Sequence, residues 1–244
     1  MKIYVIGIGP GGSQYMTPMA RQAIMESQVV VGYTLYVDLV KDLLQGKEVK
    51  STAMKQEVDR CKMALDAALE NKTVAFVCSG DAGVYGMAGV MSEVAENYPE
   101  VEIDVIPGIT AACSGAAVLG APLIHDFAVI SLSDLLTPWE KIEKRLQAAA
   151  QGDFVVCLYN PKSQKRRDYI DKAVAIMNEN GKSMETNCGY VKNIGRDGQQ
   201  GTVCKMSQLI DNDDIDMFTT VFIGNSGTKV INGKLVTPRG YKNV

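Results

Sequence analysis

Short apolar runs alternate with amphipathic segments in the first half of the chain. The runs predict buried strands at Lys2–Gly7, Val29–Gly32, Thr73–Cys78 and Val101–Ile106. An amphipathic helix is predicted between the second and third runs, because apolar residues recur at helical spacing at Val58, Cys61, Leu65 and Leu69. Thr17-Pro18 indicates a further helix start, with threonine as N-cap. Strands that alternate with helices predict an α/β fold with a mainly parallel sheet.

The pattern breaks at Gly120–Asp126, where a Gly-Ala-Pro segment precedes a new strand. We therefore predict two α/β domains, residues 1–120 and 121–244. The second domain is predicted to contain strands at Phe127–Leu132 and Phe154–Tyr159, a helix opened by Thr137-Pro138, and a helix around Asp168–Asn180. The rest is β-rich, and Asn232-Gly233 predicts a hairpin with a type I′ turn.

Composition narrows the classes of protein. A chain of 244 residues with 46% hydrophobic residues can bury two cores. The first apolar run is short and broken by glycines, and no later run approaches the roughly 18 apolar residues of a membrane helix, so we expect a cytoplasmic protein without a membrane partner. A net charge of −3 gives no general attraction for nucleic acid. Six scattered cysteines and a single histidine predict reduced thiols and no metal site.

Gly7–Gly12 satisfies the G-x-G-x-x-G pattern of dinucleotide-binding folds directly after a strand. Two features oppose that function. The next helix signal begins only at Thr17-Pro18, and no acidic residue follows the second strand, where Gly32 runs into Tyr33. A structural turn and a different binding role remain equally open for this loop.

Two further glycine motifs follow strands. Ser79–Gly86 carries three glycines at the end of one strand, more than a plain turn requires, so we interpret it as a binding loop that opens a helix. Pro107–Ala111 follows the next strand, and its Thr110 either caps a helix or contacts a ligand.

The order of the three motifs resembles that of the tetrapyrrole (corrin and porphyrin) methyltransferases over essentially the whole chain. Other segments are similar to the precorrin-3B C17-methyltransferase subgroup and its cobalt-dependent counterpart. They are Val31-Gly32-Tyr33, Gly120–Asp126, Ile130–Asp134, Tyr159-Asn160-Pro161 and Thr237–Tyr241.

The resemblance implies a homodimer of chains with two αβα domains and S-adenosylmethionine in the cleft between the domains, the class III methyltransferase fold. It implies that the cofactor contacts Gly80, Asp81, Val84, Tyr85, Thr110, Ala111, Tyr159 and Thr220. One departure is Ala82, where many relatives carry proline, which leaves the loop less rigid.

A tetrapyrrole substrate is expected at a second set of residues. The set comprises the first glycine loop, two tyrosines and a basic cluster, namely Gly9, Pro10, Gly11, Tyr33, Tyr36, Lys165, Arg166 and Arg167. The tyrosines either pack against the macrocycle or lie half-buried in the core. The cations suit a substrate with many acetate and propionate groups, although a charge run is more often a solvated surface.

The implied reaction is methyl transfer to C17 of a precorrin-3B-like or cobalt-factor-III-like ring, coupled to ring contraction. Cobalt, if present, is expected inside the substrate. Proton transfers are assigned to His125, Asp126, Ser131 and Ser133, although a single histidine is more often structural. The alternatives are methylation of another corrinoid or of a non-tetrapyrrole substrate, a nicotinamide-dependent oxidoreductase, and a nucleotide-binding regulatory module.

Overall fold

The computed structural model describes residues 1–163 and 165–242. It divides into two compact units, Met1–Ala111 and Ala112–Val244, called here the N-terminal and C-terminal units. The division falls nine residues before the predicted boundary at 120/121, because one helix packs on the second unit. In that helix a Cβ at Gly115 would lie 2.7 Å from the Phe222 ring, and Leu119 lies over Gly189.

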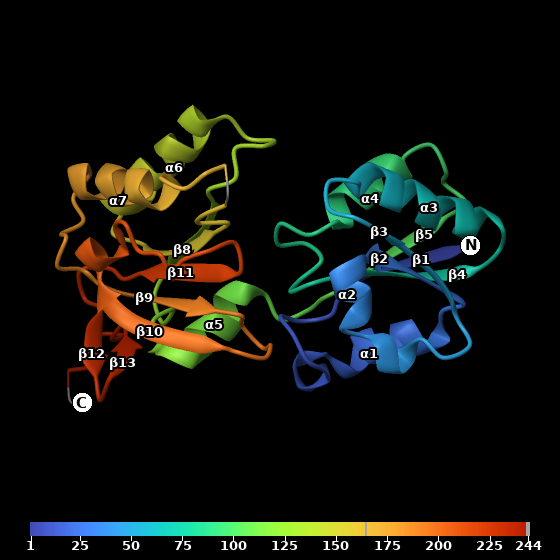
Figure 1. Cartoon of the computed structure of the whole chain (residues 1–244), viewed down its shortest axis with the longest axis horizontal. Coiled ribbons are helices and arrows are strands. Elements are labelled where there is room, and N and C mark those ends of the chain that lie inside the picture. Colours follow the sequence, from blue (N-terminus) through green and yellow to red (C-terminus); the bar gives the residue numbers. More distant parts are fainter. Residues whose placement is uncertain (164, 243–244) are drawn as a thin grey trace. The chain divides into compact units, whose positions relative to one another are not determined.

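The N-terminal unit is a parallel sheet with helices on both faces (Figure 1). Its strands lie in the order β3-β2-β4-β1-β5. Its elements are β1 (Lys2–Gly7), η1 (Ser13–Tyr15), α1 (Pro18–Glu26), β2 (Val29–Tyr33), α2 (Thr34–Asp38), η2 (Lys41–Leu43), β3 (Glu48–Thr52), α3 (Glu57–Leu69), β4 (Thr73–Cys78), α4 (Ala88–Val94) and β5 (Glu102–Ile106).

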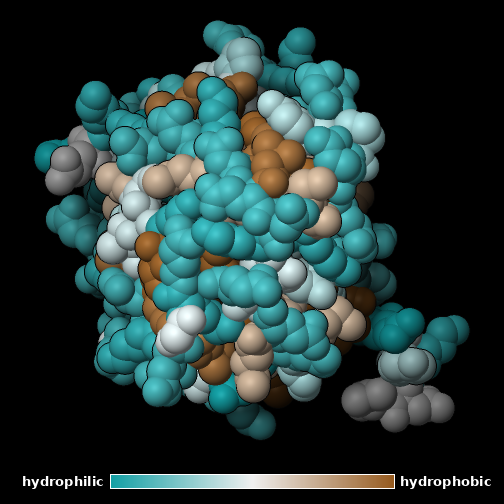
Figure 2. All heavy atoms as spheres, turned by 90° about the vertical axis from the view of Figure 1, so that its right-hand side faces the viewer, coloured by the Kyte–Doolittle hydropathy of each residue, from teal (hydrophilic) through white to brown (hydrophobic). Residues whose placement is uncertain are grey.

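Two apolar cores cover the two faces of this sheet. Ile3, Val5 and Phe76 pack with α3 and α4, whereas Ile6, Val30 and Val77 pack with α1 and α2. The strands β1, β2 and β4 therefore bury alternate residues on opposite faces, which explains their nearly continuous apolar sequences. Figure 2 shows the outer face of this unit, where hydrophilic side chains cover most of the surface between small apolar groups.

The C-terminal unit contains a mixed sheet in the order β10-β9-β11-β8-β7 and a small sheet in the order β12-β13-β6. Only β7 and β8 are parallel in the larger sheet. Its elements are α5 (Ala111–Leu119), β6 (Gly120–Ala121), β7 (Phe127–Ser131), α6 (Trp139–Gln151), β8 (Val155–Tyr159), α7 (Tyr169–Glu179), β9 (Asn187–Lys192), β10 (Gln200–Lys205), η3 (Met206–Leu209), β11 (Thr219–Ile223), β12 (Lys229–Ile231) and β13 (Lys234–Val236).

Helices again cover both faces of the larger sheet. Ile142, Leu146 and Val174 of α6 and α7 pack on one face, and α5 packs on the other (Figure 1). No helix in residues 1–163 and 165–242 combines the length and apolar character needed to cross a membrane.

Local signals behave as predicted in most places. The Thr17 hydroxyl accepts a hydrogen bond from the Ala20 N–H at 3.1 Å, which confirms the N-cap. Asn232 and Gly233 have φ angles of 50° and 73°, as a type I′ turn requires. The helix predicted to open at Thr137-Pro138 is present as α6, which begins at Trp139 with Pro138 in the N-cap position.

Candidate functional site

Three glycine-containing loops meet at one edge of the N-terminal sheet. They follow β1, β4 and β5, which are neighbours in the order β4-β1-β5. All these pairings are parallel, so the carboxyl ends of the strands lie at the same edge. This is the edge at which open α/β sheets bind ligands.

The backbones of these loops are in direct contact. Gly9 and Gly80 exchange two backbone hydrogen bonds, of 3.0 and 2.7 Å. A Cβ at Gly7 would lie 2.7 Å from the Gly108 nitrogen and 2.8 Å from the Gly80 oxygen, so glycine is required there. Pro10 and Gly11 are also buried. Gly9, Pro10 and Gly11, which the sequence assigns to the substrate, are therefore buried at this edge of the sheet.

Asp81 fastens two of the loops with its carboxylate. Its Oδ1 accepts hydrogen bonds from the backbone N–H groups of Gly83 at 2.8 Å and Val84 at 3.2 Å. Its Oδ2 accepts one from the Gly108 N–H at 2.9 Å. Both oxygens thus serve the protein backbone, and the side chain shapes the loop.

Residues 83–85 of the second loop are exposed to solvent, whereas Ala82 is buried. Val84 and Tyr85 are 37% and 56% exposed, and Tyr85 has a φ angle of 52°, in the left-handed region. Such a conformation costs a bulky residue about 1–3 kcal/mol and is often found at functional sites. The expectation that this motif itself opens a helix is wrong, because α4 begins only at Ala88.

Gly80 lies against the backbone of the third loop. Its φ angle is 70°, and a Cβ there would be in ordinary van der Waals contact with the Thr110 Cα at 3.8 Å and the Ala111 nitrogen at 3.9 Å. Ala111 is the first residue of α5, so the backbone at the helix start lies next to Gly80. Close approach without a side chain suits a ligand that contacts the backbone. These residues therefore fit the cofactor that the sequence predicts.

Tyr33 and Tyr36 lie at the end of β2 and in α2. Their rings meet edge to face, with centroids 5.1 Å apart. Both are half-buried, and Tyr36 packs against the core on the α1 and α2 face. The sequence left two positions open for these tyrosines, against the macrocycle or half-buried in the core. The position of Tyr36 in the structure is that of a half-buried core residue.

In the C-terminal unit, polar side chains gather where β7 and β8 end. The Ser131 hydroxyl accepts hydrogen bonds from Asn160 Nδ2 at 2.9 Å and from the Ser133 N–H at 3.2 Å. Ser131 pairs with Tyr159 in the parallel register, so both strands end at this level. Two predicted catalytic residues, Ser131 and Ser133, are thus brought together.

Arg166 is held within the same cluster. Its Nη1 donates to the Ser133 Oγ at 2.7 Å and to the Asp134 Oδ1 at 3.2 Å, and its side chain is only 16% exposed. The prediction that Arg166 binds substrate carboxylates is therefore at odds with a guanidinium already paired to a carboxylate. Lys165 and Arg167 are exposed, while position 164 lies outside the described residues.

Asp134 is a second centre of this cluster. The Tyr169 hydroxyl donates to its Oδ2 at 2.7 Å, and this bond, together with Arg166, holds the pKa of Asp134 below its ordinary value. The same hydrogen bond raises the pKa of Tyr169. The carboxylate is therefore ionised at neutral pH, and Ser133, Asp134, Arg166 and Tyr169 form a fixed polar clamp, called here the Asp134 clamp.

Tyr159 and Thr220 lie side by side in the larger sheet. Val221 pairs with Leu158 in the antiparallel register, which brings Thr220 level with Tyr159. The Tyr159 hydroxyl accepts a hydrogen bond from the Ala112 N–H in α5 at 2.7 Å, and Thr220 is buried. The two predicted cofactor residues of this unit are therefore neighbours.

His125 and Asp126 are exposed and precede β7, whereas Ser131 ends that strand. The Asp126 carbonyl accepts a hydrogen bond from Val155, the first residue of β8. Four residue steps of strand, about 13 Å, separate Phe127 from Ser131. The structure therefore places the four predicted catalytic residues in two groups at opposite ends of β7.

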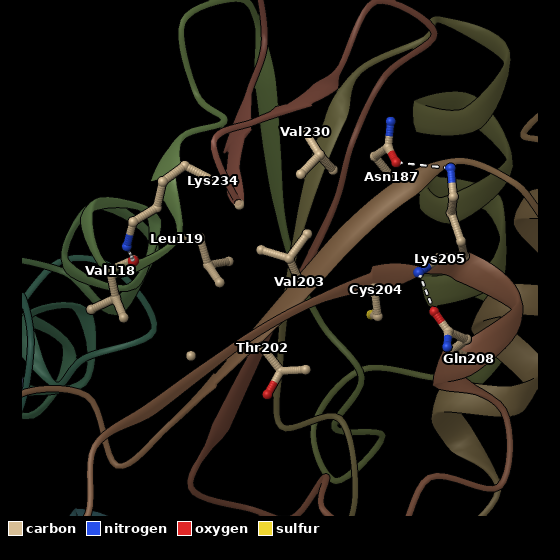
Figure 3. A pocket seen from close by; sticks show the side chains of 12 residues that line it. Val118, Leu119, Asn187, Thr202, Val203, Cys204, Lys205, Gln208, Val230 and Lys234 are labelled. Carbon is tan, nitrogen blue, oxygen red and sulfur yellow. Dashed lines mark hydrogen bonds between the residues drawn. The ribbon is translucent and has the colours of Figure 1, made fainter.

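A pocket of about 640 Å³ lies elsewhere in the C-terminal unit, beside the edge strand β10 (Figure 3). Apolar Leu119, Val203 and Val230 line it together with two lysines, whose amines donate to Asn187 and to the Val118 carbonyl. None of the predicted site residues lines this pocket. Among the described residues there is also no group of three potential metal ligands from His, Cys, Asp and Glu.

Comparison with known proteins identifies the family. A family model described as Tetrapyrrole (Corrin/Porphyrin) Methylases matches residues 2–210. The chain belongs to this family. A probable cobalt-factor III C(17)-methyltransferase of Salmonella typhimurium is 44% identical over 238 residues, covering 97% of this chain and 98% of that protein.

Two further comparisons concern the length of this chain relative to a relative and its fold relative to a solved structure. The cobalamin biosynthesis protein CbiHC of Archaeoglobus fulgidus is 46% identical over 244 residues, and this chain spans about half of it, 53% of its length. The crystal structure of the methyltransferase CobJ matches with a TM-score of 0.90 and 36% identity, covering 97% of this chain and 99% of that one. The predicted α/β methylase fold with two sheets is confirmed.

The comparisons and the structure leave several expectations as predictions. They do not test the assignment of individual residues to cofactor, substrate or proton transfer. The predicted position of the cofactor between the two domains also stays a prediction. The sequence analysis gave no role to Asp134, Asn160 and Tyr169, which join the polar cluster at the ends of β7 and β8. Asp134 and Asn160 lie within the segments that carry the resemblance, whereas no motif marks Tyr169.

Proposed function

We propose that this chain transfers a methyl group from S-adenosylmethionine to C17 of cobalt-factor III or precorrin-3B, with contraction of the ring, in cobalamin biosynthesis. The observation that carries the proposal is the match to the Salmonella protein over nearly the full length of both chains. A match over one unit alone would support only the fold.

The geometry of the N-terminal site supports a methyl-donor role for S-adenosylmethionine, which supplies an electrophilic methyl group. Gly80, Thr110 and Ala111 bring backbone groups together at this edge of the sheet, and Val84 and Tyr85 offer exposed apolar surface. The Gly7–Gly12 loop lacks the adjoining helix of a dinucleotide site, because only a short η1 turn precedes α1. Nicotinamide cofactors are therefore expected to bind poorly.

The chain's own residues act mainly by positioning. An electron-rich ring carbon is its own nucleophile, so the protein must orient it and exclude water, and needs no strong base for methyl transfer. Lys165 and Arg167 are exposed cations suited to the substrate's carboxylates. Ring contraction requires protons to move, and His125, Asp126, Ser131 and Ser133 remain the proposed groups. Cobalt belongs to the substrate in this scheme.

A homodimer and a cytoplasmic location complete the proposal. Both follow from the family resemblance and from the function, since the substrate is a soluble biosynthetic intermediate. Size-exclusion chromatography with light scattering tests the dimer directly.

The decisive experiment incubates the protein with S-adenosylmethionine and either cobalt-factor III or metal-free precorrin-3B. We expect one methyl group to be added and the product mass and spectrum to be those of a contracted ring. Binding of NAD(H), with no binding of S-adenosylmethionine, would overturn the proposal. Methylation of a different corrinoid would keep the family and change the substrate.

A further inference from the structure

The loop between β7 and α6 exposes two consecutive leucines. Leu135 is 66% exposed and Leu136 is 97% exposed, so Leu136 has almost no contact with the rest of the chain. Burying a leucine side chain is favourable, and these two adjacent leucines leave that stabilisation unused. Single exposed apolar residues are common, whereas contiguous exposed apolar surface is the feature that marks contact sites.

This loop is firmly held on both sides of the leucines. On one side the Asp134 clamp fixes it, because Arg166 and Tyr169 occupy both carboxylate oxygens. On the other side Trp139 packs against the Tyr169 ring, with centroids 4.6 Å apart. Tyr169 therefore contacts the loop before and after the leucines. The exposure of Leu135 and Leu136 belongs to an anchored loop.

The surroundings of the loop have a definite chemical character. The clamp joins it to the segment that carries Lys165 and Arg167, and neither cation has an acidic partner among residues 1–163 and 165–242. The loop with the leucines follows β7 and the segment with the cations follows β8. These strands are parallel, so they end at the same edge of the sheet. Anchored leucines beside unpaired cations complement a ligand with an apolar body and a carboxylate rim.

We propose that Leu135 and Leu136 are a contact element for the apolar body of the tetrapyrrole substrate, and that Arg166 is a positioning residue acting through Ser133 and Asp134. The proposal rests on the proposed function and adds the subsite that recognises the macrocycle. In it, Lys165 and Arg167 bind carboxylates, while Arg166 keeps the leucines and these cations on a common surface.

Leu136→Ser is the sharpest test, because a side chain that is 97% exposed can be changed without disturbing the fold. Binding of cobalt-factor III, followed by absorbance without a methyl donor, should weaken roughly tenfold, as expected when burial of one leucine is lost. The double variant Leu135→Ser/Leu136→Ser should weaken binding further. Affinity for S-adenosylhomocysteine and the melting temperature should not change.

Ile231→Ser is the matched control, since Ile231 is also exposed, at 47%, and lies on β12 away from this loop. It should leave binding unchanged. Arg166→Ala should weaken tetrapyrrole binding and Arg166→Lys should restore part of it, with the affinity for S-adenosylhomocysteine unchanged in both.

Two outcomes would overturn the inference while the function stands. One is wild-type affinity in the double leucine variant. The other is dissociation of an oligomer with unchanged affinity, which would make the loop a contact between copies of the chain. If the wild-type protein binds no tetrapyrrole, the proposed function fails, and this inference fails with it.

Discussion

The carboxylate of Asp81 and the backbone N–H of Gly108 are joined by a hydrogen bond of 2.9 Å across 27 residues of sequence. This bond ties the loop after β4 to the loop after β5. The other carboxylate oxygen is engaged by Gly83 and Val84, so one side chain sets the shape of the edge where the cofactor is proposed to bind.

Asp81→Asn should loosen this edge. An amide has one acceptor oxygen, so its NH₂ group must face either Gly108 or Gly83. Losing such a bond, with an N–H left unpaired, costs about 1–3 kcal/mol. We expect a lower melting temperature and weaker S-adenosylmethionine binding by calorimetry. Asp66→Asn, on the exposed face of α3, is the control and should behave as wild type. Unchanged cofactor affinity in Asp81→Asn would remove Asp81 from the site.

The three cations of the basic cluster should separate by role. Lys165→Ala and Arg167→Ala should each raise the tetrapyrrole KM about tenfold, the effect of one lost charge-assisted hydrogen bond of roughly 1.5 kcal/mol. Neither change should alter the melting temperature, because both side chains are exposed. Arg166→Ala should lower the melting temperature as well, because Asp134 loses its guanidinium partner. Steady-state kinetics with Lys144→Ala, an exposed α6 residue, as control will distinguish them.

His125 offers a test that separates the two chemical steps. Methyl transfer depends on positioning, whereas ring contraction needs proton transfer, so His125→Ala should still consume S-adenosylmethionine. Contraction should slow by about 100-fold or more, and the methylated, uncontracted ring should accumulate in single-turnover mass spectra. His125→Asn should rescue little. His125 lies in an exposed loop, so the melting temperature of both variants should equal that of the wild type. Normal contraction would exclude this histidine from the chemistry.

The Asp134–Tyr169 pair gives the clamp a pH dependence. The Tyr169 hydroxyl lowers the folded-state pKa of Asp134 below the unfolded value of about 3.9. The ionised carboxylate therefore stabilises the fold above that value, and the contribution is lost as the pH falls through the folded pKa. Tyr169→Phe should raise the pKa of Asp134 and reduce the loss of stability below about pH 4. The change in the free energy of unfolding should be modest, because the pair is partly solvated. Urea unfolding from pH 7 to pH 2.5 measures both effects, and identical profiles would contradict the assignment.

The sequence predicted most of the N-terminal unit because its strands are buried on both faces. Thr73–Cys78 was located to the residue. The strand Glu48–Thr52 was missed because it lies at the sheet edge and carries charged and polar residues, which remove the apolar signal. The structure divides into compact units at 111/112, where the packing of α5 decides the division, whereas the predicted boundary follows the glycine and proline residues at 120–122 that interrupt the sequence pattern.

The candidate site was predictable only where a motif carried it. The glycine loops could be predicted from their composition and from their position after strands. The contacts of the Asp134 clamp could not be predicted, because its members come from separate segments and meet only through the pairing of β7 with β8. His125 and Ser131 lie at opposite ends of β7, because residues a few positions apart along a strand are separated in space. Their assignment to proton transfer stays a prediction.

The contact among Gly7, Gly80 and Gly108 also constrains how such a chain can vary. The motifs are spread over about a hundred residues, yet Gly7 and Gly108 each leave room that the backbones of the other two glycines occupy. A methyl group added at Gly108 would meet the Gly80 carbonyl and the backbone of Gly7 at once. A substitution in one loop therefore has to be judged by the shapes of the other two. For protein engineering, we expect that the three loops must be transferred to another chain together. A single loop transferred alone would clash with the backbone of the other two.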